Sequence, residues 1–284
     1  MDQQKLLMES DGMNQIEIYA MRCGTVGTDE TIPDKRKSRN PYAYSGVLRG
    51  KKHQVWLPVY AYLIVHPKGK ILVDTGWHTQ VRQDQRKHLS WKLNIASKAL
   101  LPAGEAVTEQ LKALGLSSEE LDYVLLTHLD VDHVSGLELV KDAKCICASA
   151  AELRAVDKGD IRYNRKLWEN IAIQPIHMEN TGLGPHGRSF DVFQDGTVQF
   201  VDVSGHSAGT TGVLIQNKGK FVLITADACY NRQSWEQMCL PGITVNRDKA
   251  EASLKWVHDM SQKEECMEIL ATHDPEIKPH KIIL

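Results

Sequence analysis

Two pairs of similar motifs, with one member of each pair in each half of the chain, most limit how this chain can fold. GKILVDTG (69–76) and GKFVLITADA (219–228) each contain a turn followed by an apolar, strand-like run that ends at an aspartate. LLTHLD (125–130) and LATHDP (270–275) each end an apolar run in Thr-His. Short apolar runs bounded by polar and turn residues are typical of strands. The pattern predicts two β-rich halves that face each other and bring polar side chains from strand ends to one shared edge.

Strand-like and helix-like patterns alternate between these motifs, which predicts a mixed α/β fold. Strands are expected where β-branched and apolar residues cluster, at 16–21, 55–65, 70–73, 121–126, 197–203, 212–216, 220–225 and 268–272. Helices are expected where apolar residues recur every three or four positions, at 106–114, 150–156 and 247–260. The turn HPKG (66–69) predicts an antiparallel strand pair, and Ser117 with Glu120 resembles a capping box.

Length and composition are those of an ordinary globular protein. The chain has 284 residues, of which 42% are hydrophobic and 25% are charged. The 34 Lys and Arg residues nearly balance the 36 Asp and Glu residues, which argues against a nucleic-acid partner or an anionic membrane partner. No apolar run approaches the roughly 20 residues that cross a bilayer, and no secretory signal pattern is visible. We therefore expect one cytoplasmic domain over 1–284, and leave open whether it forms a homodimer.

The cysteines and the polar stretches carry weaker signals. None of the six cysteines lies in a CxxC pair, so we interpret them as buried or inert thiols in a reducing compartment. An N-terminal strand and loop are expected over 1–50, with the loop at 28–50, and an insertion is expected over 77–104. Either polar stretch could cover an active site, because binding residues often lie on loops, or could be a plain surface connection. The insertion carries Trp91, Leu93, Ile95 and Leu100.

The segment THLDVDH (127–133) places four potential metal ligands directly after an apolar strand. They are His128, Asp130, Asp132 and His133. Neutral imidazole combined with carboxylate oxygen suits zinc, iron or manganese. A solvated polar loop is the alternative interpretation, and further candidate ligands downstream argue against it.

Three such candidates follow strand-like runs later in the chain. His206 lies in SGHSAG (204–209), where the glycines permit a tight loop with close backbone approach. Asp227 follows a very apolar strand, where a carboxylate is costly unless it is paired, bound to metal or exposed. His273 lies in Thr-His-Asp-Pro, again at a strand end.

Taken in order, these motifs resemble the metallo-β-lactamase superfamily. The resemblance rests on LVDTG with Asp74, an HxHxDH-like cluster, a Gly-His loop, a strand-terminal Asp and a late His, and it covers about 55–275. It implies an αββα sandwich, in which two mixed β-sheets are flanked by helices, with a dinuclear metal site at one edge. The implied cofactors are two divalent metal ions, with Zn2+ as the first candidate.

The resemblance also implies a role for each candidate side chain. One metal would be held by His128, Asp130 and His206. The other would be held by Asp132, His133 and His273. Asp227 would bridge the two metals, and Asp74 would orient the site.

Position 130 departs from the family pattern, which has His where this chain has Asp. Aspartate is shorter and harder than imidazole, so three outcomes are open. Asp130 ligates directly and shifts the preference toward iron or manganese, or it ligates through water, or the first metal position is weak and the enzyme is effectively mononuclear.

Tyr230, three residues after Asp227, resembles the N-acyl-homoserine lactonase branch, in which a tyrosine hydroxyl holds and polarises the lactone carbonyl. This resemblance implies a quorum-quenching lactonase, in which metal-bound hydroxide attacks the ester carbonyl of a small-molecule lactone. Asp132 would relay a proton to the leaving group. Thr210 departs from the branch, which commonly has a second His there.

Three alternatives stay open at this point. The substrate could be another ester, a thioester or a phosphodiester, because a fold does not fix a function. The chain could instead be a non-catalytic metal-binding relative, which Asp130 favours and the other retained ligands oppose. For Tyr230 the alternative is a packing aromatic after a strand.

Overall fold

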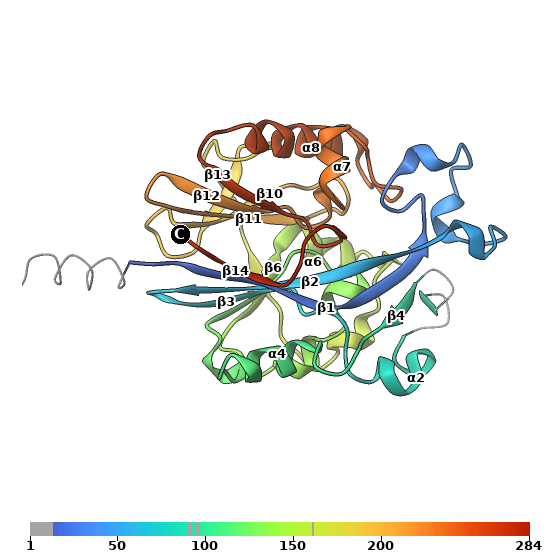
Figure 1. Cartoon of the computed structure of the whole chain (residues 1–284), viewed down its shortest axis with the longest axis horizontal. Helices are drawn as coiled ribbons and strands as arrows, with labels where there is room; N and C mark the ends of the chain where they lie inside the picture. Colours follow the sequence, from blue (N-terminus) through green and yellow to red (C-terminus); the bar gives the residue numbers. More distant parts are fainter. Residues whose placement is uncertain (1–13, 90–92, 95–96, 161) are drawn as a thin grey trace, which may run out of the picture.

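The computed structural model describes residues 14–89, 93–94, 97–160 and 162–284. Two β-sheets lie face to face, and helices cover their outer sides (Figure 1). In Figure 1, α8 (Arg247–Ser261) and α7 (Arg232–Glu236) lie beyond one sheet and α4 (Val107–Ala113) lies beyond the other. The αββα sandwich and the mixed α/β class are thereby confirmed.

The first sheet has the strand order β14-β1-β2-β3-β5-β6-β7, and β4 also pairs with β1. The pairs from β14 through β3 are antiparallel, whereas β3, β5, β6 and β7 pair in parallel. The bounds are β1 Glu17–Asp29, β2 Gln54–His66, β3 Gly69–Val73, β4 Lys98–Leu100, β5 Tyr123–Leu126, β6 Ile146–Ser149, β7 Gln174–Ile176 and β14 His280–Ile283.

The second sheet has the strand order β13-β12-β11-β10-β9-β8, in which β12 and β13 form the parallel pair. Its strands are β8 Glu179–Asn180, β9 Arg188–Asp191, β10 Val198–Asp202, β11 Thr211–Asn217, β12 Lys220–Ile224 and β13 Cys266–Leu270. The remaining α-helices are α2 Val81–His88, α5 Val131–Val134 and α6 Ala150–Asp157. The 3-10 helices are η1 Lys35–Lys37, η2 Ala43–Ser45, η3 Lys51–His53, η4 Ser118–Glu120, η5 Leu137–Val140, η6 Arg165–Trp168 and η7 Ala226–Ala228.

Alternating side chains on the central strands supply apolar layers on both faces of each sheet. In β12, Val222 and Ile224 pack into the layer between the sheets, whereas Leu223 packs with Leu254 and Val257 of α8. Successive residues of a strand point to opposite faces, so a strand that is apolar at every position is buried on both sides. Burial of each such side chain contributes about 1.5–3 kcal/mol, which fixes the register of the strands that deliver the polar side chains.

The similarity between the two halves of the sequence has a structural counterpart. β3 and β5 form a parallel pair, and so do β12 and β13. In each pair, an aspartate follows the first strand and Thr-His follows the second. The backbone N–H of Asp74 donates to Leu125 (2.8 Å), and that of Thr225 donates to Leu270 (2.9 Å). Both halves therefore use the same strand pairing to bring an aspartate and a histidine to one edge.

Several boundaries differ from the sequence predictions. β1 continues to Asp29 because its last residues pair with the start of β2, so the expected loop at 28–50 begins two residues inside a strand. β13 ends at Leu270, two residues before the predicted end, and the Thr-His that follows turns into the site. The expected insertion 77–104 contains α2 and β4, while Trp91 and Ile95 lie outside the described residues.

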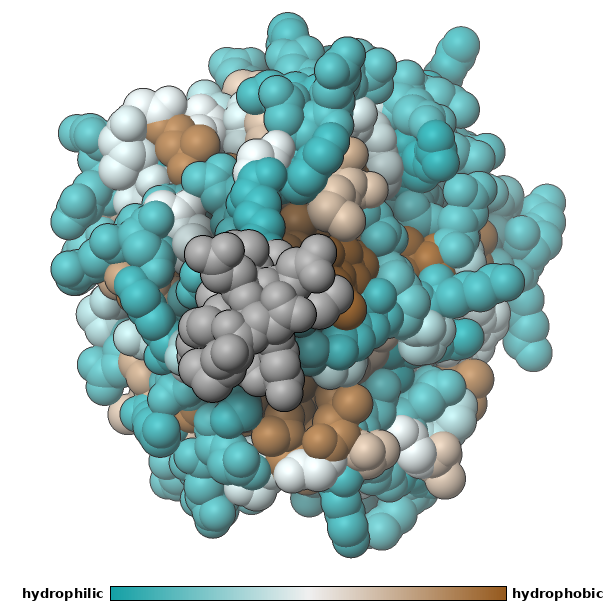
Figure 2. Space-filling model, turned by 60° about the vertical axis from the view of Figure 1, so that its left-hand side comes forward, coloured by the Kyte–Doolittle hydropathy of each residue, from teal (hydrophilic) through white to brown (hydrophobic). Residues whose placement is uncertain are grey.

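The surface and the thiols agree with the composition. On the face drawn in Figure 2, hydrophilic side chains cover most of the surface and hydrophobic ones form small, separated patches. All six cysteines are free, and four of them are buried. Within the described ranges, no helix is both long enough and apolar enough to span a bilayer.

Candidate metal centre

The seven side chains predicted as metal ligands meet at one edge of the two sheets. His128 follows the carboxyl end of β5, and His206, Asp227 and His273 follow the carboxyl ends of β10, β12 and β13. Asp130, Asp132 and His133 lie on the loop and the short helix α5 that come directly after His128. Ligand atoms within 4.8 Å of one another form three groups, which are His128 with Asp130 and His206, Asp132 with His133 and His273, and His128 with His133 and Asp227.

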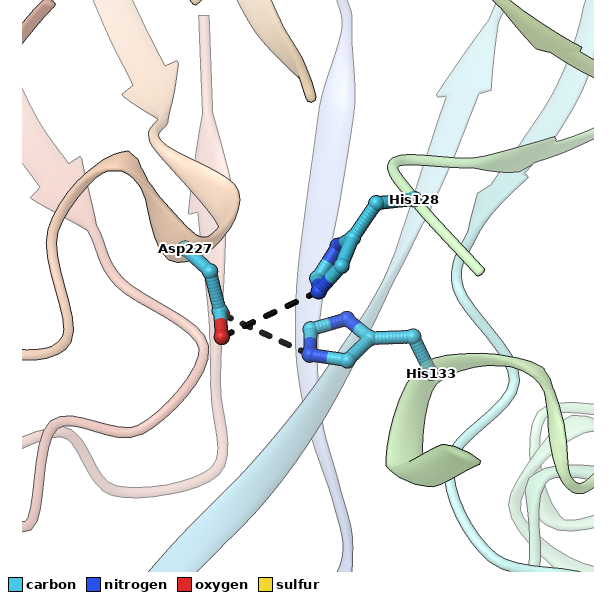
Figure 3. Close-up of side chains that lie close together, drawn as sticks. All are labelled: His128, His133 and Asp227. Carbon is cyan, nitrogen blue, oxygen red and sulfur yellow. Dashed lines mark ion pairs between the residues drawn. The ribbon is translucent and has the colours of Figure 1, made fainter. Parts of the chain in front are cut away.

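Asp227 lies between two clusters of imidazoles. Its Oδ1 is 3.4 Å from the Nε2 atoms of both His133 and His273. Its Oδ2 is 3.6 Å from Nε2 of His206 and 3.8 Å from Nε2 of His128. Figure 3 shows this carboxylate directed toward His128 and His133 from the opposite side of the site. We call the Oδ2 side, with His128, Asp130 and His206, the first subsite, and the Oδ1 side, with Asp132, His133 and His273, the second subsite.

Each of the four imidazoles is held from outside the site through Nδ1. The contacts made by Nδ1 are with Asp74 Oδ2 for His133 (2.7 Å), the Pro58 carbonyl for His273 (2.8 Å), the Ile243 carbonyl for His206 (2.9 Å) and Thr127 Oγ1 for His128 (3.0 Å). An Nδ1–H that donates outward leaves the Nε2 lone pair directed inward, which is the tautomer that binds metal. Asp74 thus occupies the orienting position predicted for it.

The loop that carries His206 depends on close backbone packing. Gly205 has φ +141°, and a Cβ there would overlap the backbone nitrogen of Ala250 in α8. A Cβ at Gly209 would likewise overlap the hydroxyl of Ser149. The predicted close approach is therefore present at both positions. Thr210 closes the same loop, because its hydroxyl accepts a hydrogen bond from the Ser207 N–H (3.0 Å).

Glu152 of α6 is a site residue that sequence reasoning missed. Its side chain is fully buried, and Oε1 accepts from the Leu129 N–H (3.1 Å) and the Tyr163 hydroxyl (2.7 Å). Oε2 accepts from the Ser207 hydroxyl (2.7 Å) and the Gly209 N–H (2.9 Å). One carboxylate therefore joins the loop of His128 to the loop of His206. Its position in an ordinary amphipathic helix gave no signal of this role.

Arg162 is the second residue that the sequence did not single out. Its guanidinium forms a bidentate ion pair with both oxygens of Asp130 and also contacts Nε2 of His206. It donates to the His206 carbonyl as well (2.8 Å). Although burial raises the pKa of Asp130, the charge of Arg162 outweighs burial and holds that pKa well below its usual range.

Tyr230 packs against one histidine of each subsite. Its ring stacks on His273 at a centroid distance of 4.9 Å and meets His206 edge-on at 5.9 Å. The side chain is 5% exposed. Burial, together with the Asp227, Asp130 and Asp132 carboxylates, raises the pKa of Tyr230 well above its usual value. Its phenol therefore stays protonated at neutral pH and can donate a hydrogen bond.

The second subsite fits a divalent cation. Nε2 of His133 and Oδ1 of Asp227 are buried and have no hydrogen-bond partner, and an unpaired buried polar atom is costly unless a cation satisfies it. Although burial raises the pKa of Asp227, His273 and His133 hold it well below its usual range, so the carboxylate is charged. In the first subsite only Nε2 of His128 is unpartnered, because Arg162 contacts Asp130 and His206.

Comparison with known proteins adds a family and a fold. The model of the metallo-beta-lactamase superfamily matches residues 55–272. The N-acyl homoserine lactonase AttM of Rhizobium radiobacter is 25% identical over 268 residues, which cover 93% of this chain and 95% of that protein.

Two solved structures share the fold. An N-acyl homoserine lactone hydrolase with the product N-hexanoyl-L-homoserine bound at its catalytic metal center superposes with a TM-score of 0.72 at 22% identity, covering 92% of this chain and 94% of that one. The dizinc quorum-quenching lactonase AidC gives a TM-score of 0.59 at 15% identity, covering 93% and 89%.

Proposed function

The chain belongs to the metallo-beta-lactamase superfamily, and on this premise we propose that it is a metal-dependent hydrolase that opens a lactone of the N-acyl-homoserine type. The observation that carries the proposal is the position of Tyr230, whose protonated phenol lies beside both clusters of inward-facing ligand atoms. The lactonase AttM, which aligns over nearly the whole chain, supports the choice of substrate class.

We assign the second subsite as the place where a divalent cation binds. Asp132, His133, Asp227 and His273 would hold it, and this mixture of imidazole and carboxylate suits Zn2+, with iron or manganese as alternatives. When bound, the ion supplies Lewis-acid polarisation of a water and of an ester carbonyl. The number of bound ions depends on whether the first subsite also takes one.

Tyr230 is assigned as the hydrogen-bond donor to the carbonyl oxygen of the lactone. Negative charge develops on that oxygen when the carbonyl carbon is attacked, and a fixed donor in a water-poor site stabilises it. Stacking on His273 holds the phenol ring in place, so little reorganisation is needed during the reaction. A residue that served only for packing would need the ring of Tyr230 but not its hydroxyl, whereas the proposed role needs both.

Asp132 is assigned to proton transfer. Its side chain keeps 13% exposure, and its Oδ2 lies 3.5 Å from Nε2 of His273. It is therefore next to the second subsite and is not fully buried. A carboxylate there can take a proton from the attacking water and deliver it to the alkoxide that leaves when the ring opens.

The experiment that tests this function compares hydrolysis of N-acyl homoserine lactones, simple esters, thioesters and phosphodiesters by the purified, metal-loaded protein. Tyr230→Phe should lower kcat on lactones by roughly 10- to 1000-fold with metal content unchanged, because one polarising donor is lost. Asp227→Ala should lose both metal and activity, because both subsites lose a carboxylate oxygen. Asp142→Ala, at an exposed position, is the matched control.

Two outcomes would contradict the proposal. If Tyr230→Phe equals the wild type on lactones, Tyr230 is a packing residue and the lactonase assignment loses its support. If the protein binds metal but turns over none of the four substrate classes, it is a non-catalytic metal-binding relative. If the protein prefers one of the other three substrate classes, the assignment as a hydrolase stands and the assignment of a lactone substrate is wrong.

A reducing compartment is part of the same proposal. All six cysteines are free, and four of them are buried. Free thiols persist where glutathione and thioredoxin keep them reduced, which supports the cytoplasm as the location.

A further inference from the structure

The guanidinium of Arg162 occupies the space where the donors of the first subsite converge. Its side chain is 12% exposed, and the Asp130 carboxylate that it pairs with is 17% exposed. Both oxygens of Asp130 accept hydrogen bonds from the guanidinium, Oδ1 from Nε and Oδ2 from Nη2. This planar fork matches the geometry of a carboxylate, which makes the pair both specific and strong.

The contact with His206 is equally specific. Because Nδ1 of His206 donates to the Ile243 carbonyl (2.9 Å), its Nε2 carries the lone pair that a metal would use. That lone pair accepts a hydrogen bond from the guanidinium of Arg162 instead. Two of the three first-subsite donors therefore already face a cation.

In the part of the chain that the structure describes, the carboxylates of the second subsite form no ion pair with an arginine or a lysine. Among the described residues, the ion pairs of Asp132 and Asp227 involve only histidines. Nε2 of His133 and Oδ1 of Asp227 lie 3.4 Å apart, and neither atom makes a hydrogen bond. The two halves of the site thus differ in what satisfies their buried lone pairs.

The segment that carries Arg162 is anchored to the site from behind. The adjacent Tyr163 donates its hydroxyl to Oε1 of Glu152 (2.7 Å), the same buried carboxylate that joins the His128 and His206 loops. Arg162 itself donates to the His206 carbonyl (2.8 Å). Removing the guanidinium from the subsite would leave Asp130 as a largely buried carboxylate without its partner, which is strongly unfavourable.

We propose that the side chain of Arg162 takes the place of the first metal ion, so that this chain binds a single divalent cation, held by Asp132, His133, Asp227 and His273. The replacement of His by Asp at position 130 then has a structural reason, because a carboxylate pairs with a guanidinium where an imidazole would not. The fixed positive charge remains beside Oδ2 of Asp227, where the family arrangement would have an ion. This inference rests on the metal binding proposed above.

The test is the metal stoichiometry of the full-length protein, which does not depend on turnover. Metal-free protein is titrated with Zn2+ by calorimetry, and metal content is measured by mass spectrometry after dialysis. The wild type should bind about one ion per chain, and Arg162→Ala should bind about two, because Asp130 and the His206 Nε2 become free to ligate. Co2+ absorption spectra should show a second set of ligand-field bands only in the variant.

Matched variants separate this role from a general effect on folding. Arg165→Ala removes a nearby exposed arginine that pairs with Asp157, and it should keep the wild-type stoichiometry. Arg162→Met keeps an unbranched apolar side chain without the guanidinium and its charge, and it should behave like Arg162→Ala. If either position 162 variant is unfolded by circular dichroism, the wild-type stoichiometry and the other variant still decide the question.

Three results would overturn the inference, and they are distinguishable. Two tightly bound ions in the wild type would show that the guanidinium does not exclude the first metal. One ion in both folded position 162 variants would show that Arg162 is not what limits binding. No bound ion in the wild type would refute the metal binding of the proposed function itself.

Discussion

The Asp74 carboxylate and the His133 imidazole are joined by a hydrogen bond of 2.7 Å between Oδ2 and Nδ1. The same carboxylate accepts from the Thr127 N–H (2.8 Å) and from the Thr127 hydroxyl (2.8 Å), and that hydroxyl contacts Nδ1 of His128 (3.0 Å). One buried side chain at the end of β3 therefore sets the tautomer of both histidines in the predicted cluster. Asp74 has φ +60°, a conformation that Asn also adopts readily.

Replacing Asp74 with Asn should weaken metal binding without disturbing the backbone. One of the two oxygens becomes an NH2 group, so either the Thr127 N–H or Nδ1 of His133 loses its acceptor. If His133 changes tautomer, its Nε2 carries a proton and cannot ligate. We expect about 10- to 100-fold weaker Zn2+ affinity, measured by competition with a chelator. A Zn2+ affinity equal to that of the wild type would show that Asp74 does not orient the metal-binding histidines.

Glu152→Gln should loosen two ligand loops at once. Each oxygen of Glu152 accepts from one backbone N–H, that of Leu129 or that of Gly209, so the amide NH2 of Gln faces a donor in either orientation. We expect a loss of about 1–3 kcal/mol in the free energy of unfolding, because a buried donor is left unpaired. Urea denaturation measures this loss, and Glu179→Gln at an exposed position is the control. Equal stability of Glu152→Gln and the wild type would contradict the bridging role.

Gly205→Ala should destabilise the protein far more than Gly219→Ala. Both glycines have positive φ, at +141° and +75°, but only a Cβ at Gly205 meets other atoms, those of Ala250. We expect about 2–5 kcal/mol for Gly205→Ala and about 1 kcal/mol for Gly219→Ala, from strain plus overlap against strain alone. Equilibrium unfolding in urea gives both values. Similar losses for the two variants would mean that the loop shifts away from α8 at little cost.

His88 should make the protein sensitive to mild acid. Burial, assisted by His78, lowers the pKa of His88 to about 4, while Glu138 opposes the shift. The ring stacks on His78 at 5.0 Å, and its Nε2 contacts the Ser135 hydroxyl (2.8 Å). The unfolded chain takes up this proton near pH 6.5, so the stabilisation is complete above about pH 6.5 and is lost as the pH falls toward about 4.

His88→Gln should remove part of that acid sensitivity. Because the side chain is only half-buried, we expect the wild type to lose about 1 kcal/mol more than His88→Gln between about pH 7 and about pH 5. Urea unfolding at the two pH values measures the difference. His177→Gln, at an exposed position, should follow the wild type. Parallel curves for the wild type and His88→Gln would show that His88 titrates normally.

The sequence allowed the fold class and the set of converging ligands to be predicted, because both depend on local patterns. The apolar run before Asp227 predicts a strand buried on both faces, and a charged residue directly after it has to be satisfied at the strand end. The same reasoning applies to His128 and His273. Edge elements were harder to predict, since β4 and β14 are defined by their pairing with β1 rather than by their own residues.

Arg162 and Glu152 could not be identified from the sequence for a different reason. Each lies in a segment of ordinary composition, and its importance comes only from which distant atoms it meets. Arg162 meets Asp130 and His206, and Glu152 meets the loops after β5 and β10. The departure from the family pattern at Asp130 was visible in the sequence. Its partner Arg162 was not, because the two residues are 32 positions apart and nothing next to Asp130 indicates which cation pairs with it.

The repeated strand pair has a consequence for how the protein assembles. Each of the three groups of converging ligand atoms combines side chains from both halves, as when His128 and His133 from one half meet Asp227 from the other. An ion bound there would connect the two halves of the sandwich. Its binding free energy would then stabilise the whole folded domain against unfolding, in addition to its role in the chemistry.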